Sequence, residues 1–406
     1  MKKQDKSMGN FPNLRFPGFE GEWEINRFQE VVKINQGLQI PISDRLVSPR
    51  DDAYFYITNE FLKDNSEKKY FIKNPPLSVL CNKEDILMTR TGNTGKVVTG
   101  VEGAFHNNFF KVSYPKNIIK GFLYNFLKLP SIQNQISKLA GTSTIPDLNH
   151  SDFYRIKFSY PELEEQKKIA EFVSFLDSRI QTQKKIIEGL SLQKISIIKK
   201  LFENKIKFKT DIKTQNWERK KLAEISEEHL NKNPNNKYNE VFSVAKHKGV
   251  INQIEHLGRS FSAKEILHYK LVHPGDLVYT KSPTSDFPFG IIKQNRTGRI
   301  GVVSPLYCVF TPKTYALGYL LHEYFNSAVN TFNYLNPLVQ KGAKNTMNIN
   351  NETFLNGASI LLPMNEVEQE KIYKFLLSID KKINLENELL TQYENQKKYL
   401  LQNLFV

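Results

Sequence analysis

The chain has 406 residues, 40% of them hydrophobic, and a formal net charge of +15 at pH 7, which allows two or three folded domains and excludes a disordered tail. The surplus of Lys and Arg favours a polyanionic partner, nucleic acid or an anionic membrane surface, although a lysine-rich globular protein from an AT-rich genome would carry the same charge. The chain has two cysteines, Cys81 and Cys308, which are too few for a disulfide framework or a cysteine-rich zinc site. The sequence shows no signal peptide and no run of 18 apolar residues, so we expect no membrane span. Together these features predict a cytoplasmic location.

Residues 1–160 are predicted to form a first globular domain. Aromatic and β-branched stretches broken by Gly, Pro and Asn indicate short strands with tight turns, and the segment 118–129 indicates a helix. Three landmarks stand out: the pair Trp23-Glu24, the strand-like segment Asp85–Arg90, and a polar loop that begins at Gly141.

Residues 161–206 are predicted to form a long helix that follows Pro161, a residue tolerated at a helix entry. Apolar side chains recur at alternating steps of three and four residues, which is the pattern of a coiled coil. The predicted apolar seam residues are Val173, Leu176, Ile180, Ile187, Leu190, Ile197 and Leu201.

Residues 207–361 repeat the landmarks of the first domain in the same order. Trp217-Glu218, the segment Asp276–Lys281 and a polar loop from Gly342 correspond to the three landmarks above. The loops between them have diverged, so the two domains share a frame and differ in their connections. This pattern suggests the same task performed on two different targets.

Residues 362–406 repeat the long helix, 203 residues after the first copy. The apolar seam recurs at Leu376, Ile379, Ile383, Leu390, Tyr393, Leu400 and Leu404. Both copies place polar residues at the same two seam positions, Gln183/Glu386 and Lys194/Lys397, and polar seam residues commonly set register and partner choice. The alternative is that each helix covers only its own domain. Against it, roughly 37 residues extend about 55 Å, which exceeds the reach of a domain of this size.

The predicted fold class is therefore α+β. Two similar, mixed and strand-rich domains are separated by two duplicated helices, which pair as an antiparallel coiled coil about a pseudo-twofold axis.

Two short motifs resemble catalytic or cofactor sites but lack essential parts. Asn74-Pro75-Pro76-Leu77 has Leu where amino-methyltransferases carry an aromatic residue, and no glycine-rich cofactor loop precedes it. Gly92–Lys96 lacks the spacing and the following Ser or Thr of a phosphate-binding loop. Both are predicted to be turns. The eight His residues show no metal-ligand spacing, and no catalytic constellation is evident, so we expect no enzyme activity, no cofactor and no metal.

These features together resemble the specificity (S) subunits of type I restriction–modification systems, over nearly the whole chain. The resemblance includes the opening LRFPGFEGEW (Leu14–Trp23), the strand GDLVYT (Gly275–Thr280), and the EQ-x-K-I start of both long helices at Glu165 and Glu368.

The resemblance implies a subunit without catalytic activity that recognises double-stranded DNA. Each globular domain would be a target recognition domain that reads one half of a split sequence. The coiled coil would set the gap between half-sites and dock two modification (methyltransferase) subunits, which restriction (nuclease/translocase) subunits would join. A split site needs two readers held at a fixed separation, and Lys and Arg contacts to phosphates would supply affinity.

The candidate DNA-contacting residues are polar side chains on the diverged loops. In the first domain they are Thr89, Arg90, Thr91, Asn93, Lys96, Thr142, Ser143 and Thr144. In the second they are Lys246, His247, Lys248, Lys281, Ser282, Thr284, Lys341, Lys344 and Asn345. Because Arg suits guanine and Asn suits adenine in the major groove, Arg90 and Asn345 are the individual choices. The alternative for any one residue is a solvated surface position.

Two other functions remain open on sequence grounds. A coiled-coil scaffold without sequence-specific DNA contact would explain the duplicated helices equally well, but not the paired, basic and loop-diverged domains. The second alternative is an enzyme with a methyltransferase site at Asn74–Leu77. In that case the purified chain would bind the methyltransferase cofactor without any partner subunit.

Overall fold

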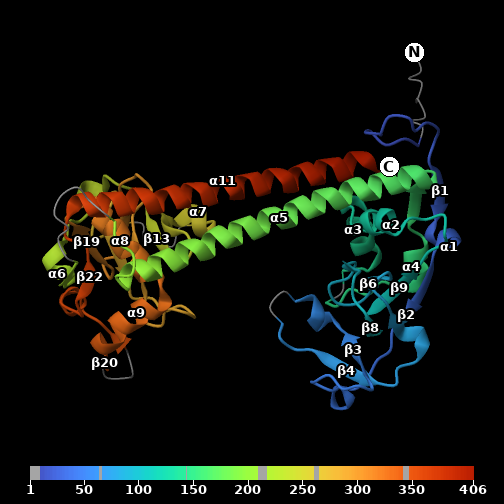
Figure 1. Cartoon of the computed structure of the whole chain (residues 1–406), viewed down its shortest axis with the longest axis horizontal. Helices are drawn as coiled ribbons and strands as arrows, with labels where there is room; N and C mark the ends of the chain where they lie inside the picture. Colours follow the sequence, from blue (N-terminus) through green and yellow to red (C-terminus); the bar gives the residue numbers. More distant parts are fainter. Residues whose placement is uncertain (1–9, 64–65, 143, 209–216, 260–264, 342–346) are drawn as a thin grey trace. The chain divides into compact units, whose positions relative to one another are not determined.

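A computed structural model describes residues 10–63, 66–142, 144–208, 217–259, 265–341 and 347–406 of the chain. Contacts divide the chain into two compact units. Unit 1 consists of Met1–Lys185 and Asn387–Val406, and unit 2 consists of Ile186–Glu386. Each unit therefore contains one globular domain and one half of each long helix (Figure 1).

The centre of unit 1 is an antiparallel sheet with strand order β2-β9-β6-β7. Its strands are β2 (Lys33–Gln36), β6 (Ile86–Thr89), β7 (Val97–Val98) and β9 (Phe109–Ser113). A second sheet, β4-β3-β8-β5, consists of β3 (Ala53–Ile57), β4 (Tyr70–Lys73), β5 (Leu80–Cys81) and β8 (Gly103–Phe105). The antiparallel pair β1 (Glu24–Arg27) and β10 (Lys157–Tyr160) joins the beginning and the end of the domain.

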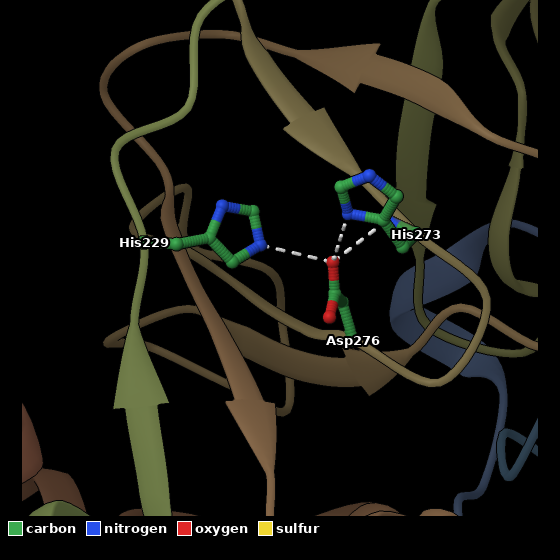
Figure 2. Close-up of side chains that lie close together, drawn as sticks. All are labelled: His229, His273 and Asp276. Atoms are coloured by element: carbon green, nitrogen blue, oxygen red, sulfur yellow. Dashed lines mark hydrogen bonds and ion pairs between the residues drawn. The ribbon is translucent and has the colours of Figure 1, made fainter.

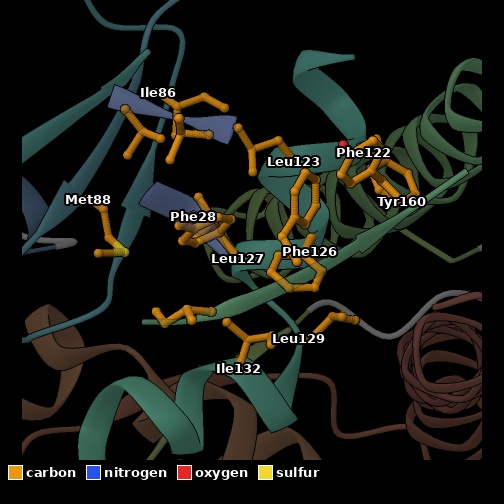
Figure 3. Close-up of a cluster of buried hydrophobic side chains, with 14 of the residues drawn as sticks. Phe28, Ile86, Met88, Phe122, Leu123, Phe126, Leu127, Leu129, Ile132 and Tyr160 are labelled. Atoms are coloured by element: carbon orange, nitrogen blue, oxygen red, sulfur yellow. The ribbon is translucent and has the colours of Figure 1, made fainter. Parts of the chain in front are cut away.

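Helices cover the central sheet of unit 1 and bury its core. They are α1 (Phe28–Val31), α2 (Lys120–Leu127), α3 (Pro130–Leu139) and α4 (His150–Tyr154), with 3-10 turns η1 (Ile42–Asp44), η2 (Asn59–Leu62) and η3 (Leu77–Val79). Phe28 lies at the centre of this core, where its ring stacks on Phe153 and contacts Phe126. Figure 3 shows Phe28 and Phe126 among the aliphatic side chains of the sheet and α2. The helix predicted within 118–129 is confirmed as α2.

Unit 2 has a central sheet of the same design, with order β12-β19-β16-β17. Its strands are β12 (Ser226–Glu228), β16 (Leu277–Thr280), β17 (Ile291–Gln294) and β19 (Cys308–Pro312). Two-stranded pairs complete the unit: β11 (Glu218–Lys220) with β22 (Ile360–Leu362), β13 (Phe242–Ala245) with β14 (Gly249–Asn252), β15 (Lys270–Val272) with β18 (Gly301–Val303), and β20 (Gln340–Lys341) with β21 (Met347–Asn348).

The helices of unit 2 are α6 (Leu222–Ile225), α7 (Gln253–Leu257), α8 (Tyr315–Asn326), α9 (Ala328–Leu335) and α10 (Asn351–Leu355), with 3-10 turns η4 (Pro234–Asn236) and η5 (Asn336–Leu338).

The two domains share a frame, since β6 and β16, the strands predicted from their common Asp start, occupy the same place in sheets of the same order. They differ where unit 1 inserts its second sheet and unit 2 inserts the β13–β14 hairpin.

The short helices α1 and α6, which follow the pairs Trp23-Glu24 and Trp217-Glu218, each contain a glutamate at the same position, Glu30 and Glu224. Glu30 accepts a hydrogen bond from the backbone N–H of Arg27 at 2.7 Å, and Glu224 accepts one from Lys221 at 2.7 Å. Each glutamate therefore satisfies a donor that the start of a helix leaves without a backbone partner. The repeated motif is a helix-capping device in both domains.

The long helices are α5 (Leu163–Phe202) and α11 (Glu366–Leu404), and no helix within the described ranges is long and apolar enough to cross a membrane. In unit 1 the first half of α5 packs against the last half of α11, where Arg179 donates to the hydroxyl of Tyr393 at 2.7 Å. In unit 2 the second half of α5 packs against the first half of α11, where Leu201, Ile372 and Leu376 share one cluster. The helices are antiparallel in both units, and every predicted apolar seam residue is buried or half-buried. The predicted fold class is confirmed.

Both motifs that resemble catalytic sites lie in turns. Asn74 has φ +46°, and Leu77 begins η3 with 85% of its surface exposed. Gly92 to Lys96 lie in the hairpin turn between β6 and β7, as the sequence predicts.

Candidate nucleic-acid interface

In unit 1 the two predicted contact loops lie side by side. Thr91 in the β6–β7 turn forms an antiparallel β-bridge with Asp147 in the loop that begins at Gly141. Thr94 donates to the carbonyl of Pro146 at 2.9 Å, and Leu148 donates its backbone N–H to the carbonyl of Arg90 at 2.9 Å. The fold thus joins two polar segments that are about fifty residues apart in sequence.

The side chains of these loops divide into structural and exposed groups. Thr89 is fully buried, and its hydroxyl donates to the carbonyl of Asn93 at 2.6 Å, so this residue shapes the turn from inside. Asn93, Thr142 and Thr144 are exposed. Lys96 is exposed along its stem, while its ammonium donates to the carbonyl of Leu62 at 2.9 Å. Ser143 lies outside the described residues.

Arg90 is held in place by an acidic partner. Its Nη2 donates to the Asp147 carboxylate at 2.5 Å, its guanidinium lies 5.6 Å from the centre of the Phe110 ring, and its side chain is 16% exposed. Thr91 also hydrogen-bonds to Asp147. Arg90 can therefore contact a base only by exchanging this ion pair, and in the free protein it fixes the two loops against each other.

In unit 2 the β13–β14 hairpin carries the basic turn Lys246, His247 and Lys248, of which His247 and Lys248 are exposed. Lys246 forms an ion pair with Asp286, which lies in the loop after β16. Lys281, Ser282 and Thr284 belong to this same loop, and Thr284 pairs with Phe287. The ion pair therefore joins two of the three predicted segments of the second domain.

A basic pocket of about 180 Å³ lies beneath the hairpin turn. Its basic lining residues are Lys246, His247, Lys248, Lys293, Arg296 and His322. Burial lowers the pKa of Lys293 to about 8, and burial lowers the pKa of His322 well below its usual value. Lys293 hydrogen-bonds to Asn326, and His322 accepts the N–H of Gln294 at 3.0 Å. Burial and this hydrogen bond favour the neutral form of His322, while the lysines and Arg296 bring positive charge to the pocket.

The third predicted segment of unit 2 is only partly described. Lys341 lies in β20, whereas Lys344 and Asn345 fall outside the described residues.

Sequence reasoning missed the residues that hold these loops. Asn59 in η2 donates to the carbonyls of Thr91 at 3.0 Å and Gly92 at 3.3 Å. Asp147 and Asp286 lie within segments that the sequence marks as polar loops, but their pairing with Arg90 and Lys246 depends on the fold. Opposite charges on two diverged loops of the same domain are the sequence signal that could have indicated these ion pairs.

Comparison with known proteins gives three findings. The family model for the type I restriction modification DNA specificity domain matches residues 20–192. The MjaVIII specificity subunit of a type I restriction enzyme from Methanocaldococcus jannaschii is 30% identical over 225 residues, or 53% of this chain and 52% of that protein. The MjaIX specificity subunit from the same organism is 28% identical over 228 residues, or 50% of this chain and 51% of that protein. The chain spans about half the length of the curated relatives it matches.

Solved structures share the fold over almost the whole chain. The S subunit of a type I restriction–modification system from M. genitalium superposes with a TM-score of 0.55 at 15% identity, covering 98% of this chain and 99% of that one. A chain from a study of complex assembly and conformational transition of the type I R-M system gives a TM-score of 0.52 at 15% identity, covering 94% and 97%. The family model thus identifies a type I restriction modification DNA specificity domain at residues 20–192, and the chain as a whole has the same fold as these specificity subunits.

Proposed function

We propose that this chain is the DNA sequence-recognition subunit of a type I restriction–modification complex. Each unit reads one half of a split target in double-stranded DNA. The chain has no catalytic activity of its own and uses no cofactor. It acts in the cytoplasm, where it directs adenine methylation by two modification subunits and cleavage by restriction subunits.

The observation that carries this proposal is the repeated frame with different loops. The order β2-β9-β6-β7 in unit 1 equals the order β12-β19-β16-β17 in unit 2, and a polar loop follows the third strand in each. Two readers built on one frame can dock on DNA in the same way while contacting different base edges, because side chains on the loops determine sequence and the frame determines position.

The charge of the chain supports a duplex as the partner. The net charge of +15 provides the counterion-releasing contacts that dominate affinity for DNA. We propose His247 and Lys248 in unit 2, and Asn93, Thr142 and Thr144 in unit 1, as the first residues to meet DNA, because they are exposed on the joined loops. Other predicted residues support or extend these loops, namely Thr89, Arg90, Thr91, Lys96, Lys246, Lys281, Ser282 and Thr284.

The test is to express the chain with its modification subunit in a host free of DNA methylation and to map N6-methyladenine across the genome. We expect one split motif, modified only when both chains are present. A stable complex of the two chains without any modified motif would instead support a coiled-coil scaffold without sequence-specific DNA contact.

A domain exchange tests whether the halves are read separately. Replacing residues 1–160 by the corresponding domain of a relative with another specificity should change one half of the methylated motif and leave the other half intact. The matched control is an exchange of residues 217–361, which should change the opposite half. A change in both halves after either exchange would contradict the proposal.

A further inference from the structure

Three side chains from separate segments of unit 2 converge outside the candidate DNA interface. His229 follows β12, His273 follows β15, and Asp276 immediately precedes β16. Figure 2 shows both imidazole rings directed at one oxygen of the Asp276 carboxylate. His229 Nε2 lies 3.0 Å and His273 Nδ1 lies 3.4 Å from Asp276 Oδ2, and the three atoms lie within 4.8 Å of one another.

The backbone and neighbouring side chains hold this cluster in place. Asp276 is 2% exposed, its Oδ1 accepts the Thr311 hydroxyl at 2.7 Å, and its Oδ2 accepts the backbone N–H of His273 at 2.7 Å. The backbone N–H of His229 donates to the carbonyl of Val309 at 3.2 Å, which fixes this residue beside β19. His229 Nδ1 is buried and has no hydrogen-bond partner among the described residues, so the ring is oriented through Nε2 alone.

Two of the three separations fit a metal ion, and the third, between the two imidazole nitrogens, lies within 4.8 Å. A tetrahedral Zn²⁺ ion with ligands at about 2.0–2.1 Å holds its ligand atoms about 3.3 Å apart. The observed separations of 3.0 and 3.4 Å from Asp276 Oδ2 lie on either side of that value. Two imidazoles and one carboxylate are ligands that Zn²⁺ and similar divalent ions accept.

Unit 1 offers an internal comparison, because the same frame carries different residues there. Counting from Val32 and Ser226, the residues that follow α1 and α6, Asn35 corresponds to His229. Asn82 and Asp85 correspond to His273 and Asp276, since the N–H of Asn82 donates to Asp85 Oδ2 at 2.9 Å in the same turn.

The shared turn explains the aspartate in both units as a structural residue. It does not explain two imidazoles in unit 2, where unit 1 has amides, which bind transition metals less well than imidazole does.

We propose that His229 Nε2, His273 Nδ1 and Asp276 Oδ2 bind a divalent transition-metal ion of the Zn²⁺ type. His273 has 42% of its side chain exposed, so water completes the coordination on that side. The ion would join three segments at the start of β16, the central strand whose other end leads into the loop of Lys281 and Thr284. The proposal does not depend on DNA recognition.

The test uses the full-length chain, stripped of metal with a chelator and titrated with Zn²⁺ by calorimetry and with Co²⁺ by visible absorption. The decisive variant is H229N/H273N, which reproduces the Asn, Asn and Asp set of unit 1 on a frame that accommodates it. The matched control is His268→Asn, because His268 is an exposed histidine of the same unit.

We expect the wild-type chain and the control to bind one ion with the visible bands of four-coordinate Co²⁺. The double variant should bind more than about 100-fold more weakly, since even the loss of an outer-shell partner costs 10–100-fold. Circular dichroism of the double variant checks that it folds. Failure of the wild-type chain to bind either ion, or equal binding by the folded double variant, overturns the proposal.

Discussion

Single residues explain why both long helices begin with the pair Glu-Gln. Glu165 is fully buried and accepts two hydrogen bonds from Arg15, at 2.8 and 2.7 Å, whereas Glu368 accepts the indole N–H of Trp217 at 3.0 Å. Gln166 and Gln369 each donate to the carbonyl of a preceding proline at 2.8 Å. The pair therefore anchors each helix to its own domain, with the same amide contact and a different partner for the carboxylate.

The Arg15–Glu165 pair leads to a prediction about stability. Arg15→Ala leaves the buried carboxylate of Glu165 without its partner, which should destabilise unit 1 by about 3–5 kcal/mol. Each unit contains one tryptophan, so urea unfolding followed by Trp23 fluorescence in a Trp217→Phe background reports unit 1 alone. The control Arg155→Ala removes an arginine whose side chain is 66% exposed from its pair with Asp152, and should cost about 0–1 kcal/mol. Equal losses would show that burial does not govern this pair.

At the scale of elements, the polar seam positions of the two helices form corresponding ion pairs. Lys194 of α5 contacts Asp380 of α11 at 2.6 Å in unit 2, and Lys397 of α11 contacts Asp177 of α5 in unit 1. The two lysines differ in their surroundings. Lys194 also contacts Glu323 of α8 at 2.8 Å, and Glu323 is 3% exposed, whereas Asp177 is 46% exposed. The duplicated helices therefore share this Lys–Asp ion pair, but the carboxylates that contact the lysine are more buried in unit 2 than in unit 1.

This difference predicts unequal effects of the same substitution. Lys194→Met leaves two largely buried carboxylates with Arg296 as their remaining cation and should cost unit 2 about 3 kcal/mol. Lys397→Met leaves behind only Asp177, whose carboxylate is 46% exposed and remains solvated, and should cost unit 1 about 0–1 kcal/mol. Urea unfolding followed by Trp217 and Trp23, each in the background that lacks the other, measures both. A larger loss for Lys397→Met would contradict the burial argument.

Acid should act on unit 2 through Asp380. Burial raises the pKa of this carboxyl. Hydrogen bonds from Lys194 and Tyr319 and the positive charges of Lys194 and Arg296 lower the pKa by more than burial raises it, so the net shift is downward. A lowered pKa in the folded state means stabilisation that is complete above the ordinary Asp pKa and is lost as pH falls through the folded value. The stability difference between wild type and Asp380→Asn, measured by urea unfolding, should therefore be constant from about pH 7 to 5 and shrink below about pH 4. A difference that does not change with pH would exclude this role.

The elements also show which parts of the fold the sequence can predict. Period and repetition predicted α5, α11 and the strands from Asp85 and Asp276, because local pattern determines such elements. Approaches between distant segments were not predictable. Asn59 meets Thr91, and His229 meets His273, only because strand pairing brings their loops together. The same limit applies to Arg90, whose sequence context indicates a free polar loop, while its partner Asp147 is 57 residues away.

At the scale of the whole molecule, each unit is assembled from distant parts of the chain, and both long helices pass from one unit to the other. Under the proposed function, these helices set the number of base pairs between the half-sites. One heptad inserted after Gln183 and one after Glu386 keep both seams in phase and add about 10 Å of helix. We expect the methylated motif to gain about three unread base pairs, at about 3.4 Å each, with both half-sites unchanged.

Methylome mapping of the insertion variant measures this directly. A two-residue insertion at the same two points is the control, because it rotates the following residues by about 200°, which moves the seam to the opposite face of each helix and should abolish methylation. An altered half-site with an unchanged gap would contradict the role of the helices as a spacer.

The split composition of unit 1 has a consequence for how the protein is made. Leu404 and Phe405 belong to the core around Trp23, and the backbone N–H of Leu14 donates to the carbonyl of Asn403 at 2.8 Å. The ribosome must therefore synthesise all of unit 2 before the residues that complete unit 1 exist, a delay of roughly 10–40 s at about 5–20 residues per second. Unit 2, whose segments are contiguous, can close first. Unit 2 can then fold before unit 1, although most of unit 1 is translated first. A chain truncated before Leu404 would lack residues that complete the core of unit 1.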